Sequence, residues 1–193
     1  MKKDANVILG FDLDGVIVDH FPNKAIVVKR LGLSIKTKDL ASDILNKKLS
    51  VDARRAAGDF LYDNMRSALE PQLFGGVLDI LKFVEAKGGR YFLISKRGDP
   101  SKGIRLLQKR GLWPKFFNSR NAFFVDTISD KNKKAAELGV SHYIDDQPSV
   151  LKELKAVKHK FLFDPYGSFG HPRRYKKISS WKEFPKELDG IIE

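Results

Sequence analysis

Apolar residues gather in five short runs along the chain, each bounded by polar or turn-forming residues. Most of these runs are continuous and do not alternate between apolar and polar positions, which is typical of strands covered on both faces in a parallel sheet. The runs predict a sheet of about five strands. The predicted strands are Val7 to Phe11, Tyr91 to Ile94, Ala122 to Val125, His142 to Ile144 and Lys160 to Phe163.

Helical periodicity fills the stretches between these strands. Three segments have apolar residues at helical spacing and end at a glycine, the usual place for a left-handed helix end. They are Val77 to Lys87, Ile104 to Arg110 and Lys131 to Leu138. A further helix is expected from Pro148, since proline is tolerated in a first turn. Alternating strands and helices predict an α/β fold with a Rossmann-like parallel sheet flanked by helices.

About sixty residues after the first strand break this alternation, because they contain helical patterns and no convincing strand. The helical patterns are Asn23 to Arg30, Lys38 to Leu49 and Val51 to Leu69, the last with Ser50 as its N-cap. We predict that residues 20–72 form a small helical cap inserted after the first strand, and that residues 1–19 and 73–193 form the core domain. The turn-rich tail after Asp164 carries Trp181 and Phe184, which we expect to pack back onto the core.

The composition fits one globular domain with a small insertion, since 42% of the 193 residues are hydrophobic and 31% are charged. Cysteine is absent, which excludes disulfides, thiolate metal sites and sulfur nucleophiles. No apolar run approaches a signal sequence or the ~20 residues of a membrane span, so we expect a soluble cytoplasmic protein with no membrane partner. The net charge of +12 is spread along the chain; it indicates a solubilising surface and leaves nucleic acid open as a partner without supporting it.

The densest chemical signal is Phe11-Asp12-Leu13-Asp14-Gly15, directly after the first predicted strand. Two carboxylates at positions i and i+2 of extended chain point the same way. Both can therefore face one site at the carboxyl end of the strand, which is where ligands bind in open α/β sheets.

A second acidic pair, Asp145 and Asp146, follows the fourth predicted strand. In a parallel sheet both pairs reach the same edge, so up to four carboxylates gather there. That much negative charge needs a counter-ion. Oxygen ligands suit a hard divalent cation, and Mg²⁺ is the expected cofactor, held by Asp12, Asp14, Asp145 and Asp146.

Two further groups are expected at this edge. The second predicted strand ends in Ser95-Lys96-Arg97-Gly98, a turn whose hydroxyl, cations and main-chain N–H groups could hold a phosphate. Lys131 begins a helix near the same edge and could reach the acidic cleft, although Lys133 and Lys134 compete for that role.

In these motifs the sequence resembles the haloacid dehalogenase-like (HAD) superfamily of phosphohydrolases, from about Val7 to Leu154. Asp12-Leu13-Asp14-Gly15 is similar to the first motif of the family, Ser95 to the second, Lys131 to the third and Asp145-Asp146 to the fourth. The motifs occur in the family's order, and each lies at a predicted strand end or helix start.

The resemblance implies a phosphatase with an aspartyl-phosphate intermediate. Asp12 would be the nucleophile and Asp14 the general acid and base. Ser95 would bind a phosphoryl oxygen, together with Lys96, Arg97 and Gly15 in the substrate site. Lys131 would reduce the repulsion between Asp12 and the phosphoryl group, and the segment 20–72 stands where the family carries its cap.

Other functions stay open at this point. A phosphotransferase or mutase on the same scaffold would share Asp12 and Asp14, and a phospho-accepting receiver module could use Asp126 after the third predicted strand. The late pair Asp145-Asp146 and the long insertion do not fit a receiver module. A nucleic-acid-binding protein is suggested by charge alone, without a groove-reading motif.

The substrate is expected to be a small phosphorylated metabolite. Gln147, Pro148 and Trp181 resemble features of nucleotidase-like members of the superfamily, which favours a nucleoside monophosphate. The candidates for contacts from the cap are Phe21, Arg54, Arg55, Phe60 and Tyr62.

Overall fold

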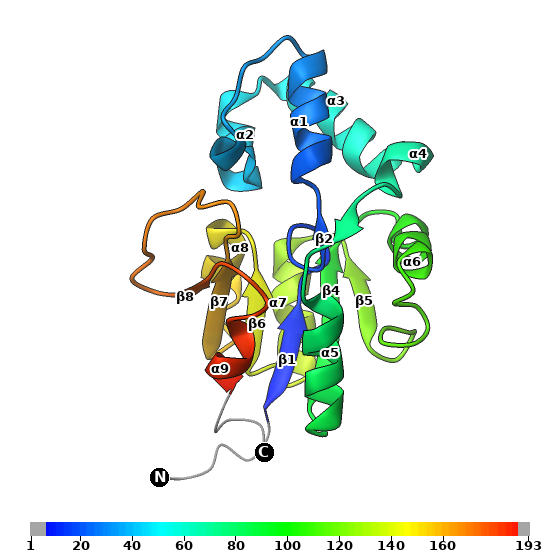
Figure 1. Ribbon diagram of the computed structural model, residues 1–193, viewed down its shortest axis with the longest axis vertical. Helices are drawn as coiled ribbons and strands as arrows, with labels where there is room; N and C mark the ends of the chain where they lie inside the picture. The colour runs from blue at the N-terminus through cyan, green and yellow to red at the C-terminus, as the bar shows by residue number, and fades with distance from the viewer. Residues whose placement is uncertain (1–6, 189–193) are drawn as a thin grey trace.

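A computed structural model describes residues 7–188, and its centre is a six-stranded sheet in the order β5-β4-β1-β6-β7-β8 (Figure 1). All neighbouring strands in it run parallel. With β1 near the middle, its carboxyl end lies between the carboxyl ends of β4 and β6. The strands are β1 Ile8–Phe11, β4 Arg90–Lys96, β5 Ala122–Val125, β6 His142–Asp145, β7 His159–Phe163 and β8 Lys176–Ile178.

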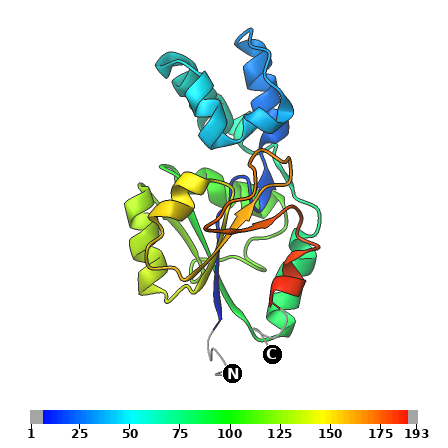
Figure 2. The ribbon, with the colours of Figure 1, turned by 90° about the vertical axis from the view of Figure 1, so that its left-hand side faces the viewer.

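Helices cover both faces of this sheet, as the two views in Figures 1 and 2 show. Leu9 and Phe11 of β1 pack in one apolar cluster with residues of α5, α6 and α9. Ile8 packs in a second cluster with residues of α7 and α8 on the other face. This split explains the continuous apolar runs, because both faces of each inner strand are buried. The helices are α5 Val77–Ala86, α6 Pro100–Lys109, α7 Ile128–Glu137, α8 Pro148–Glu153 and α9 Phe184–Leu188.

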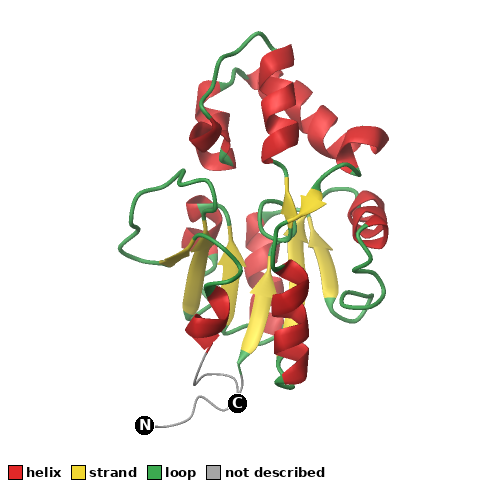
Figure 3. Cartoon of the chain, in the orientation of Figure 1, coloured by secondary structure: helices red, strands yellow, loops and turns green. Residues whose placement is uncertain are grey.

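A helical insertion leaves the core after β1 and stands over the carboxyl ends of the strands (Figure 3). Its two connections form the short antiparallel pair β2 Val18–Asp19 and β3 Gln72–Leu73. The insertion has its own apolar cluster, which includes Val27, Leu45 and Leu61. Its elements are α1 Phe21–Arg30, the 3₁₀-helix η1 Thr37–Leu40, α2 Ser42–Lys48, α3 Val51–Gly58, the π-helical turn η2 Asp59–Asp63 and α4 Met65–Ala68.

The predicted fold class is confirmed: a parallel sheet flanked by helices, with a small helical insertion after β1. The details differ in the insertion, where the long segments predicted as single helices break at Ala41 and again at η2. Ser50 does cap α3, accepting a hydrogen bond of 3.2 Å from the Ala53 N–H. The strands β2 and β3 were not predicted, because two residues are too few to carry a period.

The tail packs onto the core and adds the edge strand β8, which was not predicted because Lys176-Lys177-Ile178 contains a single apolar residue. Trp181 is 1% exposed and contacts the rings of Phe11 and Phe163. Within residues 7–188, no helix combines the length and the apolar composition needed to cross a bilayer.

Candidate active site

The turn after β1 places the first acidic pair at the carboxyl edge of the sheet. The Asp12 N–H still donates to the Ile144 carbonyl of β6 at 3.1 Å, so the chain leaves the sheet only after Asp12. The turn then closes on itself, because the Val18 N–H donates to the Leu13 carbonyl at 3.0 Å. Trp181 supports it from beneath through an Nε1 hydrogen bond of 3.0 Å to the Val16 carbonyl.

Lys131 bridges the two acidic segments. Its Nζ lies 2.8 Å from Oδ1 of Asp12 and 2.8 Å from Oδ2 of Asp145, and all three side chains are buried. The side chain of Thr127 caps α7 and so holds the first turns that carry this lysine. Burial lowers the pKa of Lys131, but Asp12 and Asp145 outweigh it and hold that pKa well above its ordinary value, so the ammonium stays charged.

Asp12, Asp145 and Asp146 converge so that one carboxylate oxygen from each lies within 4.8 Å of the others. Burial raises the pKa of Asp145 and of Asp146, which is the expected response of carboxylates without enough positive charge around them. Oδ1 of Asp146 is buried and has no hydrogen-bond partner among the described residues. The donor set and this unpartnered oxygen fit a hard divalent cation such as Mg²⁺.

Gly15 lies against the same cluster. It has φ +86°, in the left-handed region, and a Cβ built on it would lie 2.4 Å from Oδ2 of Asp146. Only glycine therefore lets the turn pass this close to the Asp146 carboxylate.

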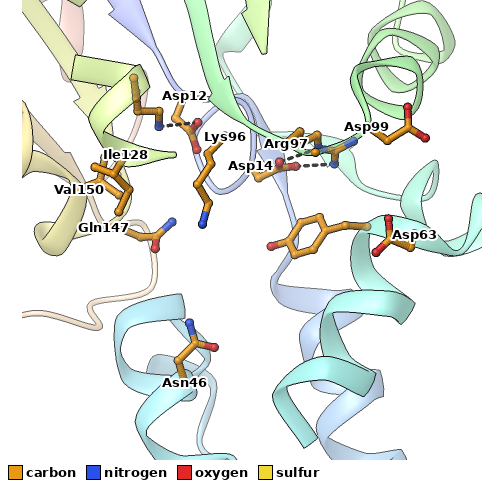
Figure 4. A pocket seen from close by; sticks show the side chains of 13 residues that line it. Asp12, Asp14, Asn46, Asp63, Lys96, Arg97, Asp99, Ile128, Gln147 and Val150 are labelled. Carbon is orange, nitrogen blue, oxygen red and sulfur yellow. Dashed lines mark hydrogen bonds and ion pairs between the residues drawn. The ribbon is translucent and has the colours of Figure 1, made fainter. Parts of the chain in front are cut away.

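The carboxylate of Asp14 is outside this group and is held by two other side chains. Arg97 donates from Nε to Oδ2 at 2.9 Å and from Nη2 to Oδ1 at 2.8 Å (Figure 4). His20 Nε2 lies 2.6 Å from Oδ1. Burial raises the pKa of Asp14, but Arg97 and His20 outweigh it and hold that pKa well below its usual range. These bonds hold the Asp14 carboxylate outside the cluster of Asp12, Asp145 and Asp146, and the metal contact expected of Asp14 stays a prediction.

A cavity of about 470 Å³ opens between this edge of the sheet and the insertion (Figure 4). Its walls come from the β1 turn, the β4 turn, the starts of α6, α7 and α8, and the insertion. It is lined by Asp12, Asp14, Asn46, Tyr62, Asp63, Lys96, Arg97, Gly98, Asp99, Ile128, Lys131, Gln147 and Val150.

The predicted lysine lies in the acidic cluster, whereas its two competitors lie on the outer face of α7. Lys133 pairs with Asp130 at 3.4 Å and Lys134 with Glu137 at 2.5 Å. Ser95 is 1% exposed at the end of β4, and among the described residues it is not one of those lining the cavity.

Arg97 was predicted to bind substrate; it lines the cavity, and its guanidinium is hydrogen-bonded to Asp14. Of the predicted cap contacts, Tyr62 lines the cavity, and its ring lies 5.3 Å from that of His20 and under Arg97 at 5.6 Å. Phe21 stacks on Tyr166 at 3.9 Å, and Phe60 stacks under Arg30 at 4.6 Å. Arg54 and Arg55 are exposed.

Sequence reasoning missed His20, Asn46 and the buried Lys24. His20 lies five residues after Gly15, the last residue of the first motif, and this closeness in sequence was the one available signal. Lys24 donates to Ser42 Oγ at 2.9 Å, and burial lowers its pKa although Asp146 and other acids oppose this. Nothing in the helical pattern of α1 or α2 marks either Lys24 or Asn46, because facing the core depends on how the insertion docks.

Comparisons with solved structures reveal the same fold. A haloacid dehalogenase-like protein of unknown function from Agrobacterium tumefaciens superposes with a TM-score of 0.69 and 18% identity, over 98% of this chain and 100% of that chain. A HAD family hydrolase from Deinococcus radiodurans, with bound phosphate and sodium, superposes with a TM-score of 0.66 and 15% identity, over 98% of this chain and 97% of that chain. A HAD-hydrolase from Bacillus subtilis bound to magnesium superposes with a TM-score of 0.63 and 13% identity, over 95% of this chain and 99% of that chain.

No family model and no curated protein matches the sequence itself. The structural likeness extends over nearly the whole chain and includes the helical insertion. The chain therefore has the fold of the haloacid dehalogenase-like hydrolases.

Proposed function

We propose that the protein is a magnesium-dependent phosphatase that hydrolyses a small phosphomonoester through an aspartyl phosphate on Asp12. The observation that carries the proposal is the convergence of Asp12, Asp145 and Asp146 around a shared point, with Lys131 bonded to two of them beside the cavity. A carboxylate nucleophile needs both a counter-charge and room for its substrate, and both are found at Asp12.

The three clustered carboxylates would hold Mg²⁺, and the resemblance adds the main-chain carbonyl of Asp14. When bound, the ion would supply positive charge that lets an anionic phosphoryl group approach Asp12. The solved structures add support at the level of the fold, since the Bacillus subtilis protein is bound to magnesium and the Deinococcus radiodurans protein has bound phosphate.

In the first step a carboxylate oxygen of Asp12 attacks phosphorus, the bond from phosphorus to the ester oxygen breaks, and Asp14 gives that oxygen a proton. In the second step water attacks the aspartyl phosphate, passes a proton to Asp14 and releases phosphate and free Asp12. The clamp by Arg97 holds Asp14 as the carboxylate needed for the second step. His20, whose Nε2 is 2.6 Å away, is the neighbouring group that can pass Asp14 a proton for the first.

The helical insertion, predicted as the domain 20–72, would act as a lid that selects the substrate. Asn46, Tyr62 and Asp63 of the insertion line the cavity opposite Asp12, which supports this role. The nucleotidase part of the expectation loses one support, because Trp181 is 1% exposed in the core and cannot stack on a base. The substrate class is taken up below.

The test is hydrolysis of p-nitrophenyl phosphate by the purified protein with Mg²⁺, with chelator, and in the Asp12→Asn variant. We expect turnover that needs the ion and disappears with the substitution. Full activity after exhaustive removal of metal would contradict the proposal. A screen of phosphorylated metabolites, nucleoside monophosphates included, would then rank substrates.

A further inference from the structure

Charged side chains line much of the cavity, and among residues 7–188 all but one of them have a partner of opposite charge. Asp12 is paired with Lys131 and Asp14 with Arg97. On the wall formed by the insertion and α6, Asp63 lies 3.1 Å and Asp99 lies 3.5 Å from Nζ of Lys102, which comes from α6.

The exception is Lys96, the last residue of β4. It lines the cavity, its side chain is exposed, and its Nζ makes no ion pair or hydrogen bond with any described residue. In Figure 4 its side chain extends past Asp12, away from the sheet and toward the insertion. An ammonium free of protein carboxylates and directed into a cavity is a ready partner for an anion.

Two carboxamides extend into the same part of the cavity. Gln147 follows the acidic pair, and its main-chain N–H donates to Oδ1 of Asp145 at 3.0 Å. Its side chain lines the cavity and is directed into it (Figure 4). Asn46 enters from α2 on the opposite wall. Neither side-chain amide has a partner among the described residues. Their N–H₂ groups can both donate to an oxyanion.

We propose that the substrate carries a second anionic group besides its phosphoryl group, and that Lys96 binds this second group with help from Asn46 and Gln147. The inference rests on the proposed function, since it assumes that the phosphoryl group is at Asp12. The second group is a carboxylate or a second phosphate, which share anionic oxygens. A cavity of about 470 Å³ lies at the lower end of the range for ligand sites, so the two groups belong to one compact molecule.

The test is calorimetric binding of three phosphonates, which cannot be hydrolysed, to the full chain with Mg²⁺. Propylphosphonate has one anionic group, 3-phosphonopropionate adds a carboxylate, and 1,3-propanediphosphonate adds a second phosphonate. We expect one of the last two to bind about tenfold or more tightly than propylphosphonate, the effect of one charge-assisted contact. The ligand that binds more tightly than propylphosphonate identifies the second group as a carboxylate or a phosphate.

Lys96→Met should remove this preference by weakening the ligand with two anionic groups more than propylphosphonate, and Lys96→Arg should restore part of it. Lys82→Met, which removes an exposed lysine on α5, is the matched control for lost charge and should keep the preference. Asn46→Ala and Gln147→Ala should each weaken it. Melting temperatures of all variants check that they are folded.

Equal binding of all three ligands by the unaltered protein would overturn the proposal. An equal loss of affinity for all three ligands in Lys96→Met would also overturn it, because Lys96 would then bind the transferred phosphoryl group. The proposed function is judged separately: Mg²⁺-dependent hydrolysis of p-nitrophenyl phosphate can succeed when the preference for a second anion is absent.

Discussion

Gly15 and Asp146 are in such close contact that a β-carbon at position 15 would lie 2.4 Å from Oδ2 of the aspartate. The contact joins the first acidic motif to the last, which are far apart in the sequence. It makes the shape of the β1 turn and the position of a candidate metal ligand depend on each other.

Gly15→Ala should therefore weaken Mg²⁺ binding as well as stability. Left-handed backbone at a residue other than glycine costs about 1–3 kcal/mol, and the new methyl group must also displace the Asp146 carboxylate. Gly88→Ala is the control, because Gly88 also has a positive φ, +65°, but its Cβ would meet nothing within 4 Å. The measurement is the rise in melting temperature on adding Mg²⁺. We expect that rise to shrink in Gly15→Ala and to persist in Gly88→Ala; the same rise in both would contradict the coupling.

Substitution of the two motif aspartates should separate their roles. Asp12→Asn should abolish turnover, because a carboxamide cannot form the acyl phosphate. Asp14→Asn should slow turnover by about 100- to 10,000-fold, the usual effect of losing a general acid and base. Its deficit should be smaller for p-nitrophenyl phosphate than for an alkyl phosphate, because nitrophenolate hardly needs a proton to leave.

The covalent intermediate gives a second measurement for this pair. Asp14→Asn lacks the base for the water step, so phosphorylated protein should accumulate and can be located by acid quenching and peptide mapping. A phosphoryl group on Ser95 or Asp126, or near-normal turnover by Asp12→Asn, would show that another residue is the nucleophile.

The two hydrogen bonds from Arg97 to the Asp14 carboxylate predict that Arg97 affects the pH dependence of kcat. Arg97 lowers the pKa of Asp14 whereas burial raises it, so Arg97→Met should raise that pKa. Asp14 acts as a base only when deprotonated, and the acid limb of the kcat profile should therefore move to higher pH. Arg97→Lys should lie between, since lysine cannot form both bonds of the guanidinium fork.

The measurement is kcat for p-nitrophenyl phosphate from the lowest pH at which the protein stays folded up to about pH 8, since the acid limb of the unaltered protein is expected at the low end of this range and that of Arg97→Met at higher pH. Arg120→Met, which removes an exposed arginine outside the cavity, is the control for lost charge and should leave the profile in place. An acid limb that stays where it is in Arg97→Met would mean that Asp14 does not control it.

The insertion is joined to the core beside the cavity by Asp43 and Ser149. Oδ2 of Asp43 accepts from the Ser149 N–H at 2.8 Å and Oδ1 accepts from the Ser149 hydroxyl at 2.6 Å. Asp43→Ala should raise KM by about 2- to 10-fold with little change in kcat, because exposed hydrogen bonds contribute about 0.5–1.5 kcal/mol. The double variant with Ser149→Ala should be little worse than Asp43→Ala.

Asp52→Ala, which removes an exposed acid of α3, is the control for the Asp43 variant and should leave KM unchanged. Fully additive effects of the two substitutions at Asp43 and Ser149 would show that their contact does not hold the lid.

The strands and helices of the core could be predicted because burial on both faces leaves a local trace. Continuous apolar runs mark β1 and β4, and glycines mark the ends of several helices. The edge strand β8 left no such trace, since an edge needs few apolar residues. Trp181 was correctly expected to pack on the core, whereas its suggested link to a nucleotide was not supported by its position.

By itself the sequence determined the α/β fold, the helical insertion and the edge of the sheet that carries Asp12, Asp14, Asp145 and Asp146, because the alternation of strands and helices and the position of a residue at a strand end leave local patterns. Only the tertiary structure decided the pairing of charges. In it Lys131 is paired with Asp12 and Asp145, Arg97 is paired with Asp14, and Lys96 is directed into the cavity. Adjacent cations are alike in sequence, and their partners depend on distances of a few ångströms between elements far apart in the chain.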